Sequence, residues 1–159
     1  MRREAFLAIA ILALSSPALS QDAQPAIAVA GAVQKPETLT LQDLQKLPLT
    51  TVSISFETDK GTESATYAGA LLWTVVSAAA PTDSAGKNAY ARHTILVTGR
   101  DGYAAALSEG EIDPKLEGKS VLLACEKDGK PIADGIRLVV PGDHHGARAV
   151  RDVVRIDVQ

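Results

Sequence analysis

The stretch RLVVPGDHHGAR, residues 137–148, joins an apolar run to a polar loop and gives the strongest local signal in the chain. The run from Leu138 to Val140 predicts a buried strand, which ends at Pro141 because proline has no N–H to donate to a sheet. The loop that follows carries four side chains able to bind a metal, an anion or a substrate: Asp143, His144, His145 and Arg148. A polar turn without a ligand is the plain alternative.

The segments on either side of this stretch predict a β-rich domain. Strand signals occur at residues 51–57, 93–99, 104–107, 119–127, 135–141 and 152–158. Two helices are expected. The first begins after Thr40, which forms a capping box with Asp43, and the second spans about 69 to 80. Because strands and helices do not alternate regularly, these elements predict a single α+β domain of mixed sheets with two short helices.

Two further local signals predict how strands are connected. Ser108 and Glu111 have the spacing of a second capping box, over a short turn that ends at Pro114. Asp128-Gly129 is a dipeptide typical of a two-residue hairpin turn. Each signal places polar side chains at the end of a strand, where a sheet can hold them in fixed positions.

The first 20 residues predict a cleaved secretory signal peptide. Two arginines precede an apolar run from Ala5 to Leu14, and Ala18-Leu19-Ser20 supplies small residues before a cleavage position. The run is about half of the ~20 residues that a membrane-spanning helix needs, so no membrane insertion is expected after cleavage. The expected division is a signal peptide at 1–20, a tail at 21–30 and a domain at 31–159, with a periplasmic or secreted location.

Composition argues against several classes of function. The chain has 16 lysines and arginines against 19 aspartates and glutamates, a net charge of −3, and it has no basic run. Nucleic acid and anionic membrane surfaces are therefore poor partners. Cys125 is the only cysteine, so an exported chain cannot form an internal disulfide.

The motifs of common catalytic sites are missing from the sequence. Adjacent histidines on an extended chain point to opposite sides, and further ligands at suitable spacing are lacking, so no metal is predicted. No nucleophile elbow, dinucleotide fingerprint or P-loop occurs. Cys125 ends an apolar strand beside Glu126, a position that disfavours a thiolate and favours a buried small side chain.

Three arginines fall within one short region: Arg137, Arg148 and Arg151. Guanidinium groups bind carboxylates and phosphates in two-point contacts, and Gly142 and Gly146 allow close backbone approach, so an anion site is one interpretation. The other is a solvated network of ion pairs with nearby aspartates, which contributes little to stability. The sequence pattern leaves both open.

Four segments in this order resemble the molybdopterin-binding domain of the sulfite-oxidase family. They are GAVQKPETLTLQDLQKLP (31–48), YAGALLWTVV (67–76), VTGRDGYAAALSEGEIDP (97–114) and GIRLVVPGDHHGARAVRDVVRIDV (135–158). The resemblance covers residues 31–159 and implies a sulfite-oxidase-like fold with a basic cleft for a pyranopterin. Carried over residue by residue, it implies ligand contacts from Arg137, His144, His145 and Arg148, and from Asp101 and Tyr103 of the D-G-Y turn.

A pterin is a flat bicycle with a donor-rich edge, and the sequence offers partners for both features. The possible stacking surfaces are Trp73, Tyr103, Tyr67 and Tyr90, and the possible carboxylate acceptors are Asp101, Asp134 and Asp143. Trp73 falls on an apolar helix face, where aromatic residues are mostly buried in the core.

The sequence departs from the catalytic members at one decisive place. In those members a cysteine thiolate holds molybdenum from a segment that here reads VSISFETDKGTES, residues 52–64, and contains no cysteine. The leading hypothesis is therefore an exported, non-catalytic protein that binds a pterin or molybdopterin-type ligand and acts as a ligand-dependent partner of a periplasmic or membrane protein. The alternatives are a molybdopterin-dependent oxidoreductase without a protein thiolate ligand, and an interaction module with no ligand.

Overall fold

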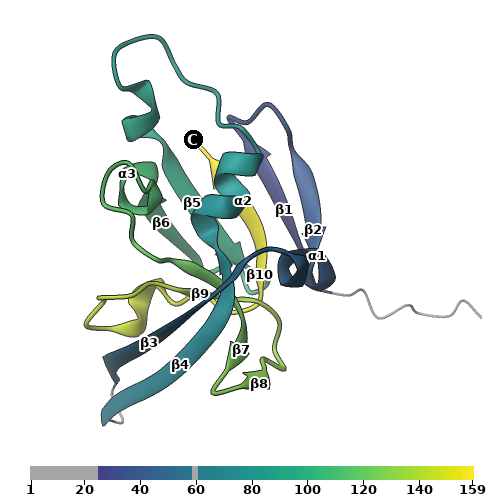
Figure 1. Ribbon diagram of the computed structural model, residues 1–159, viewed down its shortest axis with the longest axis vertical. Coiled ribbons are helices and arrows are strands. Elements are labelled where there is room, and N and C mark those ends of the chain that lie inside the picture. Colours follow the sequence, from purple (N-terminus) through teal and green to yellow (C-terminus); the bar gives the residue numbers. More distant parts are fainter. Residues whose placement is uncertain (1–24, 59–60) are drawn as a thin grey trace, which may run out of the picture.

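The computed structural model of the chain describes residues 25–58 and 61–159. The predicted signal peptide at 1–20 lies outside the described residues. These described residues form ten strands in two sheets, together with short helices (Figure 1). In the described part of the chain, no helix is both long enough and apolar enough to cross a membrane.

The first sheet has the strand order β2-β1-β10-β5-β6. Its strands are β1 (Ala26–Gly31), β2 (Glu37–Thr40), β5 (Thr94–Gly99), β6 (Ala104–Ser108) and β10 (Val153–Val158). The β1–β10 pair is parallel and the other pairs are antiparallel. The carboxyl-terminal strand therefore lies at the centre of the sheet, beside the first described strand.

The second sheet has the order β3-β4-β7-β8, with β9 also paired to β7. Its strands are β3 (Leu49–Thr58), β4 (Gly61–Leu71), β7 (Leu122–Lys127), β8 (Lys130–Pro131) and β9 (Arg137–Val139). The helical segments are α1 (Leu41–Lys46), α2 (Leu72–Ala78) and α3 (Glu109–Ile112), with short 3-10 turns η1 (Ala89–Arg92) and η2 (Gly146–Arg148). The predicted fold class, a β-rich α+β domain, is confirmed, with α3 as a third short helix.

The main core fills the space between the two sheets and the inner faces of α1 and α2. Buried side chains from every layer contribute to it, among them Ile27, Leu44, Val76, Leu123 and Ile156. Successive residues of β7 face opposite ways, so Leu122 and Ala124 belong instead to a smaller cluster on the other face of the second sheet. That smaller cluster includes Tyr67 and lies beside the site described below.

Both capping boxes are confirmed. The Thr40 hydroxyl accepts from the Asp43 N–H at 3.2 Å, and the Asp43 carboxylate accepts from the Thr40 N–H at 3.1 Å. At α3 the Ser108 hydroxyl accepts from the Gly110 N–H at 3.1 Å, and the Glu111 carboxylate accepts from the Ser108 N–H at 2.9 Å. These contacts satisfy N–H groups that the first turn of a helix leaves without partners.

One expected boundary was wrong. The helix expected at 69 to 80 begins only at Leu72, because the residues before it form the end of β4 and pair with β3 on one side and β7 on the other. Strand β1 begins at Ala26, inside the segment expected at 21–30, and its Ile27 and Val29 are buried and pair with β2.

Candidate functional site

An open cleft of about 580 Å³ lies between β4 and the β7–β8 hairpin. Its size falls within the range of small-molecule sites. The hairpin is sharp because Asp128 and Gly129 both adopt positive φ, 51° and 73°, as the predicted turn requires. The lining residues are Tyr67, Lys127, Asp128, Lys130, Pro131, Ile132, Ala133, Asp134, Arg137 and Arg151.

The floor of this cleft is the ring of Tyr67, which is 1% exposed. Two cations lie over the ring: Lys127 Nζ is 5.9 Å from its centroid and Arg137 Cζ is 5.8 Å from it. Such contacts attract a cation to the ring face and favour one position of the long side chain. Tyr67 therefore helps to hold both positive groups at the cleft.

The cleft carries an excess of positive charge in an acidic protein. Four cations line it, Lys127, Lys130, Arg137 and Arg151, against two carboxylates, Asp128 and Asp134. Asp128 is already engaged, since its Oδ1 accepts from the Thr66 N–H at 2.9 Å. Within residues 25–58 and 61–159, none of the four cations forms an ion pair with a carboxylate. An anionic or carbonyl-rich ligand would find these donors available.

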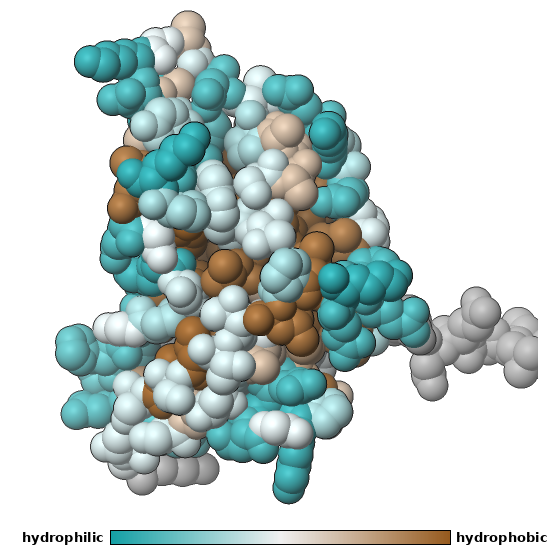
Figure 2. Space-filling view, in the orientation of Figure 1, coloured by the Kyte–Doolittle hydropathy of each residue, from teal (hydrophilic) through white to brown (hydrophobic). Residues whose placement is uncertain are grey.

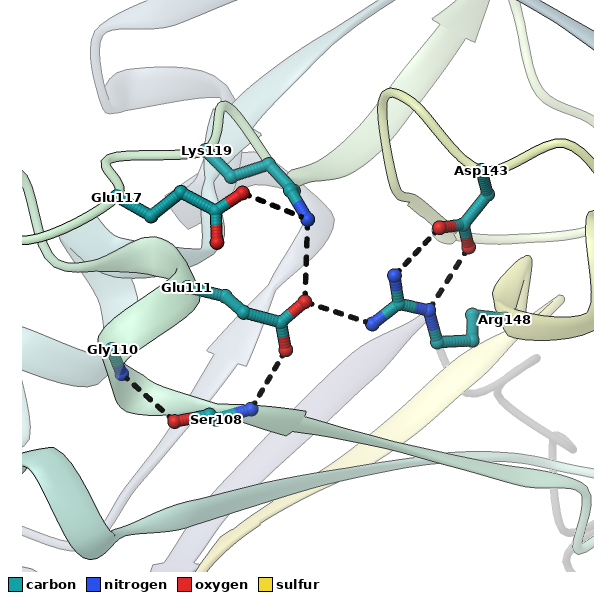
Figure 3. A network of polar contacts seen from close by, with 7 residues as sticks. All are labelled: Ser108, Gly110, Glu111, Glu117, Lys119, Asp143 and Arg148. Carbon is teal, nitrogen blue, oxygen red and sulfur yellow. Dashed lines mark hydrogen bonds and ion pairs between the residues drawn. The ribbon is translucent and has the colours of Figure 1, made fainter.

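Arg148 has a different environment, shown in Figure 3. Its guanidinium makes a two-point contact with Asp143, from Nε to Oδ2 at 3.0 Å and from Nη2 to Oδ1 at 2.6 Å. The third nitrogen, Nη1, donates to Glu111 Oε1 at 3.0 Å. The hydrogen bonds that Arg148 donates to Asp143, and next those to Glu111, raise the pKa of Arg148. Arg148 thus connects the 143–148 loop to α3 and has its charge satisfied by the protein itself.

Glu111 is the centre of this network. Its Oε1 also accepts from Lys119 Nζ at 3.3 Å, and Lys119 contacts Glu117 at 3.2 Å (Figure 3). Burial opposes ionisation of Glu111, but hydrogen bonds from the Ser108 N–H, Arg148 and Lys119 outweigh it, so the pKa of Glu111 is lowered. Three segments are therefore tied together by charge-assisted hydrogen bonds.

The two histidines lie where the loop rests on the end of β3. The carbonyl of His144 accepts from the Glu57 N–H at 2.9 Å, and His145 forms a parallel bridge with Glu57. Beneath the loop, a Cβ on Gly146 would come within 3.1 Å of the Phe56 ring. The hollow that remains there is about 10 Å³, room for hardly one water molecule. A bicyclic ring does not fit under this part of the loop.

The D-G-Y turn connects to the same loop. Asp101 Oδ1 accepts from the Tyr103 N–H at 2.9 Å, and the Tyr103 hydroxyl donates to the Ala147 carbonyl at 2.5 Å. The Tyr103 side chain is otherwise half exposed. Asp101 also borders a shallow hollow of about 330 Å³ with Arg100, Asp152 and Arg151, and Arg151 reaches the cleft as well.

Among the residues that the sequence offered as ligand contacts, the structure places Arg137, Arg151, Tyr67 and Asp134 in the cleft. Trp73 packs against the main core, Tyr90 lies in η1, and the others lie at the 143–148 loop or the D-G-Y turn. The contacts predicted for His144 and His145 stay predictions. Sequence reasoning missed Lys127 and Lys130, although their positions on either side of the Asp128-Gly129 turn were a usable signal.

The comparisons with known proteins agree with this architecture. The family model described as the oxidoreductase molybdopterin binding domain matches residues 15–159. The chain belongs to this family. Among solved structures, the sulfane dehydrogenase SoxCD from Paracoccus pantotrophus has the same fold, with a TM-score of 0.69 and 20% sequence identity. The similarity covers 84% of this chain and only 37% of that one, and no curated protein sequence matches.

The cleft residues fit the organic part of a molybdopterin, the cofactor that the family implies. Arg137, Arg151 and the two lysines can donate to carbonyl and phosphate oxygens, and Asp134 can accept from an amino-pyrimidine edge. The chain does not supply a thiolate suited to ligate the metal of that cofactor. Cys125 is buried, its thiol contacts the Ala68 carbonyl at 3.7 Å, and burial together with the charge of Glu126 raises its pKa.

Proposed function

We propose that this chain binds a pterin-type ligand of the molybdopterin class in the cleft between β4 and β8 and carries out no redox chemistry. The observation that carries the proposal is a cleft lined by four cations that form no ion pair with a carboxylate among the described residues, two of which, Lys127 and Arg137, lie over the buried ring of Tyr67. Lys127 and Arg137 are partly buried, and an unpaired cation at such a position is costly unless a ligand, solvent or ring contact compensates it, whereas Lys130 and Arg151 are exposed. Membership of a molybdopterin-binding family supports a pterin as that ligand.

Each side chain has a definite task in this proposal. Arg137 and Arg151 donate hydrogen bonds to ring carbonyl and side-chain oxygens of the ligand, and Asp134 accepts from its amino group. Ile132 and Tyr67 supply the apolar wall and floor. Arg148 orders the loop, since three of its five N–H groups donate to Asp143 and Glu111 and its charge is paired with both carboxylates.

The non-catalytic role is supported by the donor set of the chain. The single cysteine lies inside β7, is buried and is not among the residues that line the cleft, and burial and the charge of Glu126 raise the pKa of its thiol. A protein thiolate for molybdenum is therefore missing from the position where the catalytic members of the family have one. The predicted signal peptide supports export, and an exported pterin-binding domain without an activity of its own would act through a periplasmic or membrane partner.

The test is a fluorescence titration of the purified protein with 6-hydroxymethylpterin and with its phosphate ester. We expect binding, weakened about tenfold or more by Arg137→Gln, because a charge-assisted hydrogen bond contributes about 1.5–3 kcal/mol. Arg155→Gln is the matched control, since Arg155 is equally cationic but pairs with Asp157 at 2.5 Å and does not line the cleft.

Two results would overturn the proposal. The first is the absence of binding to either pterin by the wild-type protein, or equal weakening by the two substitutions. The second is stoichiometric molybdenum in freshly purified protein by elemental analysis, which would make the chain an oxidoreductase instead. Mass spectrometry of copurifying small molecules identifies which pterin is carried.

A further inference from the structure

The β3 strand forms one edge of the second sheet. It pairs along its whole length with β4, from Leu49 opposite Ala70 to Thr58 opposite Gly61. The β3–β4 hairpin projects from the body of the protein, with the η2 loop and β8 on either side of it in Figure 1. On its outer side, within the described residues, the β3 backbone pairs with another segment only at Glu57, where the 144–145 backbone lies. Among residues 25–58 and 61–159, no backbone hydrogen bond is made to the outer edge of residues 49–55.

The direction of the free backbone groups follows from the contact at Glu57. Its N–H points away from β4, to the His144 carbonyl at 2.9 Å. Backbone groups of a strand alternate in direction with a period of two. The N–H and C=O groups of Leu49, Thr51, Ser53 and Ser55 therefore also point outward. This row of donors and acceptors is long enough to pair with another strand.

The edge lacks the features by which proteins prevent strand addition. Residues 49–55 read LTTVSIS, without a charge or a proline, and the register with β4 shows no bulge. On one face Ser53 and Thr66 share a hydrogen bond at 3.0 Å, and Ser64 donates to Ser55 at 3.0 Å. The other face carries the half-buried Val52 and Ile54. Figure 2 shows the hairpin as mostly pale, weakly polar surface.

We propose that the β3 edge pairs with the β3 edge of a second copy of this chain, antiparallel and centred on Val52. The free stretch runs from 49 to 55, and its midpoint is Val52. In this register Leu49 lies opposite the Ser55 of the second copy, and Thr51 lies opposite its Ser53. The four outward residues of each strand then form about eight hydrogen bonds across the two-fold axis.

The pattern of side chains selects a second copy as the occupant. Val52 meets itself and Thr50 meets Ile54, so the small apolar cluster of the sheet continues across the axis. Hydroxyl side chains meet on the opposite face, and no two like charges are brought together. The self-complementary strand joins the two sheets into one continuous sheet, and the cleft, on the far side of β4, stays open.

Disulfide trapping tests the register directly. Across a two-fold axis, two copies of residue 52 form a directly opposed non-hydrogen-bonded pair, about 4.5 Å apart between Cα atoms, close enough for a disulfide. Val52→Cys should therefore give a covalent dimer on oxidation. Ile54→Cys is the matched control, because two copies of residue 54 would be about 14 Å apart. The native Cys125 is buried and does not interfere.

The second test measures dimer dissociation by analytical ultracentrifugation. Ser53→Pro removes an outward N–H from each copy and is tolerated on an edge strand, so it should weaken the dimer by about tenfold or more. Ser53→Ala keeps the N–H and should leave the dissociation constant of the dimer unchanged. Thr51→Lys should weaken the dimer while Ser64→Lys, on the inner strand, should not. A wild-type protein that stays monomeric at millimolar concentration, or trapping as efficient at residue 54 as at 52, overturns the proposal.

Discussion

Replacing Arg148 with alanine should lower the stability of the protein more than it lowers ligand affinity. The change removes three hydrogen bonds between charged groups and leaves Asp143 and Glu111 without their main partner. The side chains of Arg148, Asp143 and Glu111 are 30%, 23% and 22% exposed. Breaking an ion pair costs ~0–1 kcal/mol at the surface and ~3–5 kcal/mol in the interior, and these partly exposed side chains lie between the two. We therefore expect a loss of about 2 kcal/mol, or roughly 6–10 °C in Tm.

Urea denaturation followed by circular dichroism measures this loss, with Arg155→Ala as the control. Arg155 pairs with Asp157 at a surface where it is 51% exposed, so its removal should cost under ~1 kcal/mol. The loss should also depend on pH. The pKa of Glu111 is lowered in the folded state, so its contribution is complete above its ordinary pKa and disappears as pH falls through the folded value. Equal losses for the two substitutions, or a stable Arg148→Ala protein that no longer binds pterin, would refute the structural role.

Two further predictions concern local structure. Hydrogen bonds from Thr40 lower the pKa of Asp43 from 3.8 to about 2. The capping interaction is therefore complete above about pH 3.8 and is lost as the pH falls through about 2. An NMR titration of the Asp43 carboxyl would show this. Gly31→Ala should destabilise the protein by at least ~3 kcal/mol in the same urea assay, because Gly31 has φ +91° and a Cβ there would lie 2.1 Å from the Val158 carbonyl oxygen. Gly129→Ala is the control: Gly129 has φ +73° but a Cβ there would meet open space, so the substitution should cost no more than ~1–2 kcal/mol.

Local signals carried most of the fold prediction. The two capping boxes and the Asp128-Gly129 turn depend on side chains within three residues of one another, so a sequence contains all the information they require. The strands in which apolar and polar residues alternate were equally predictable from the sequence. The β4 strand was not, because GTESATYAGAL is rich in small and polar residues and becomes a strand through its pairing with β3 and β7.

The candidate site was harder to predict from the sequence for the same reason. Arg137, Arg148 and Arg151 are close in sequence, and nothing in their spacing says which of them has a carboxylate partner. Of the two carboxylates that pair with Arg148, Asp143 is five residues away and within reach of a sequence argument, but Glu111 is 37 residues away. The resemblance to the molybdopterin-binding family grouped Arg148 with the ligand contacts, and the structure shows its three donor groups directed at two side chains of the protein.

The pairing state of a cation is therefore more informative than its position in a motif. A guanidinium that is paired with two carboxylates, as Arg148 is, stabilises a loop and has fewer donors and less unpaired charge to offer a ligand. A guanidinium over an aromatic floor, such as Arg137 above Tyr67, is held in place by its π contact while its donors stay directed into the cleft. The two arginines, 11 residues apart in the sequence, therefore differ in their surroundings: Arg148 ties the 143–148 loop to α3, and Arg137 lines the cleft in which we propose that the ligand binds.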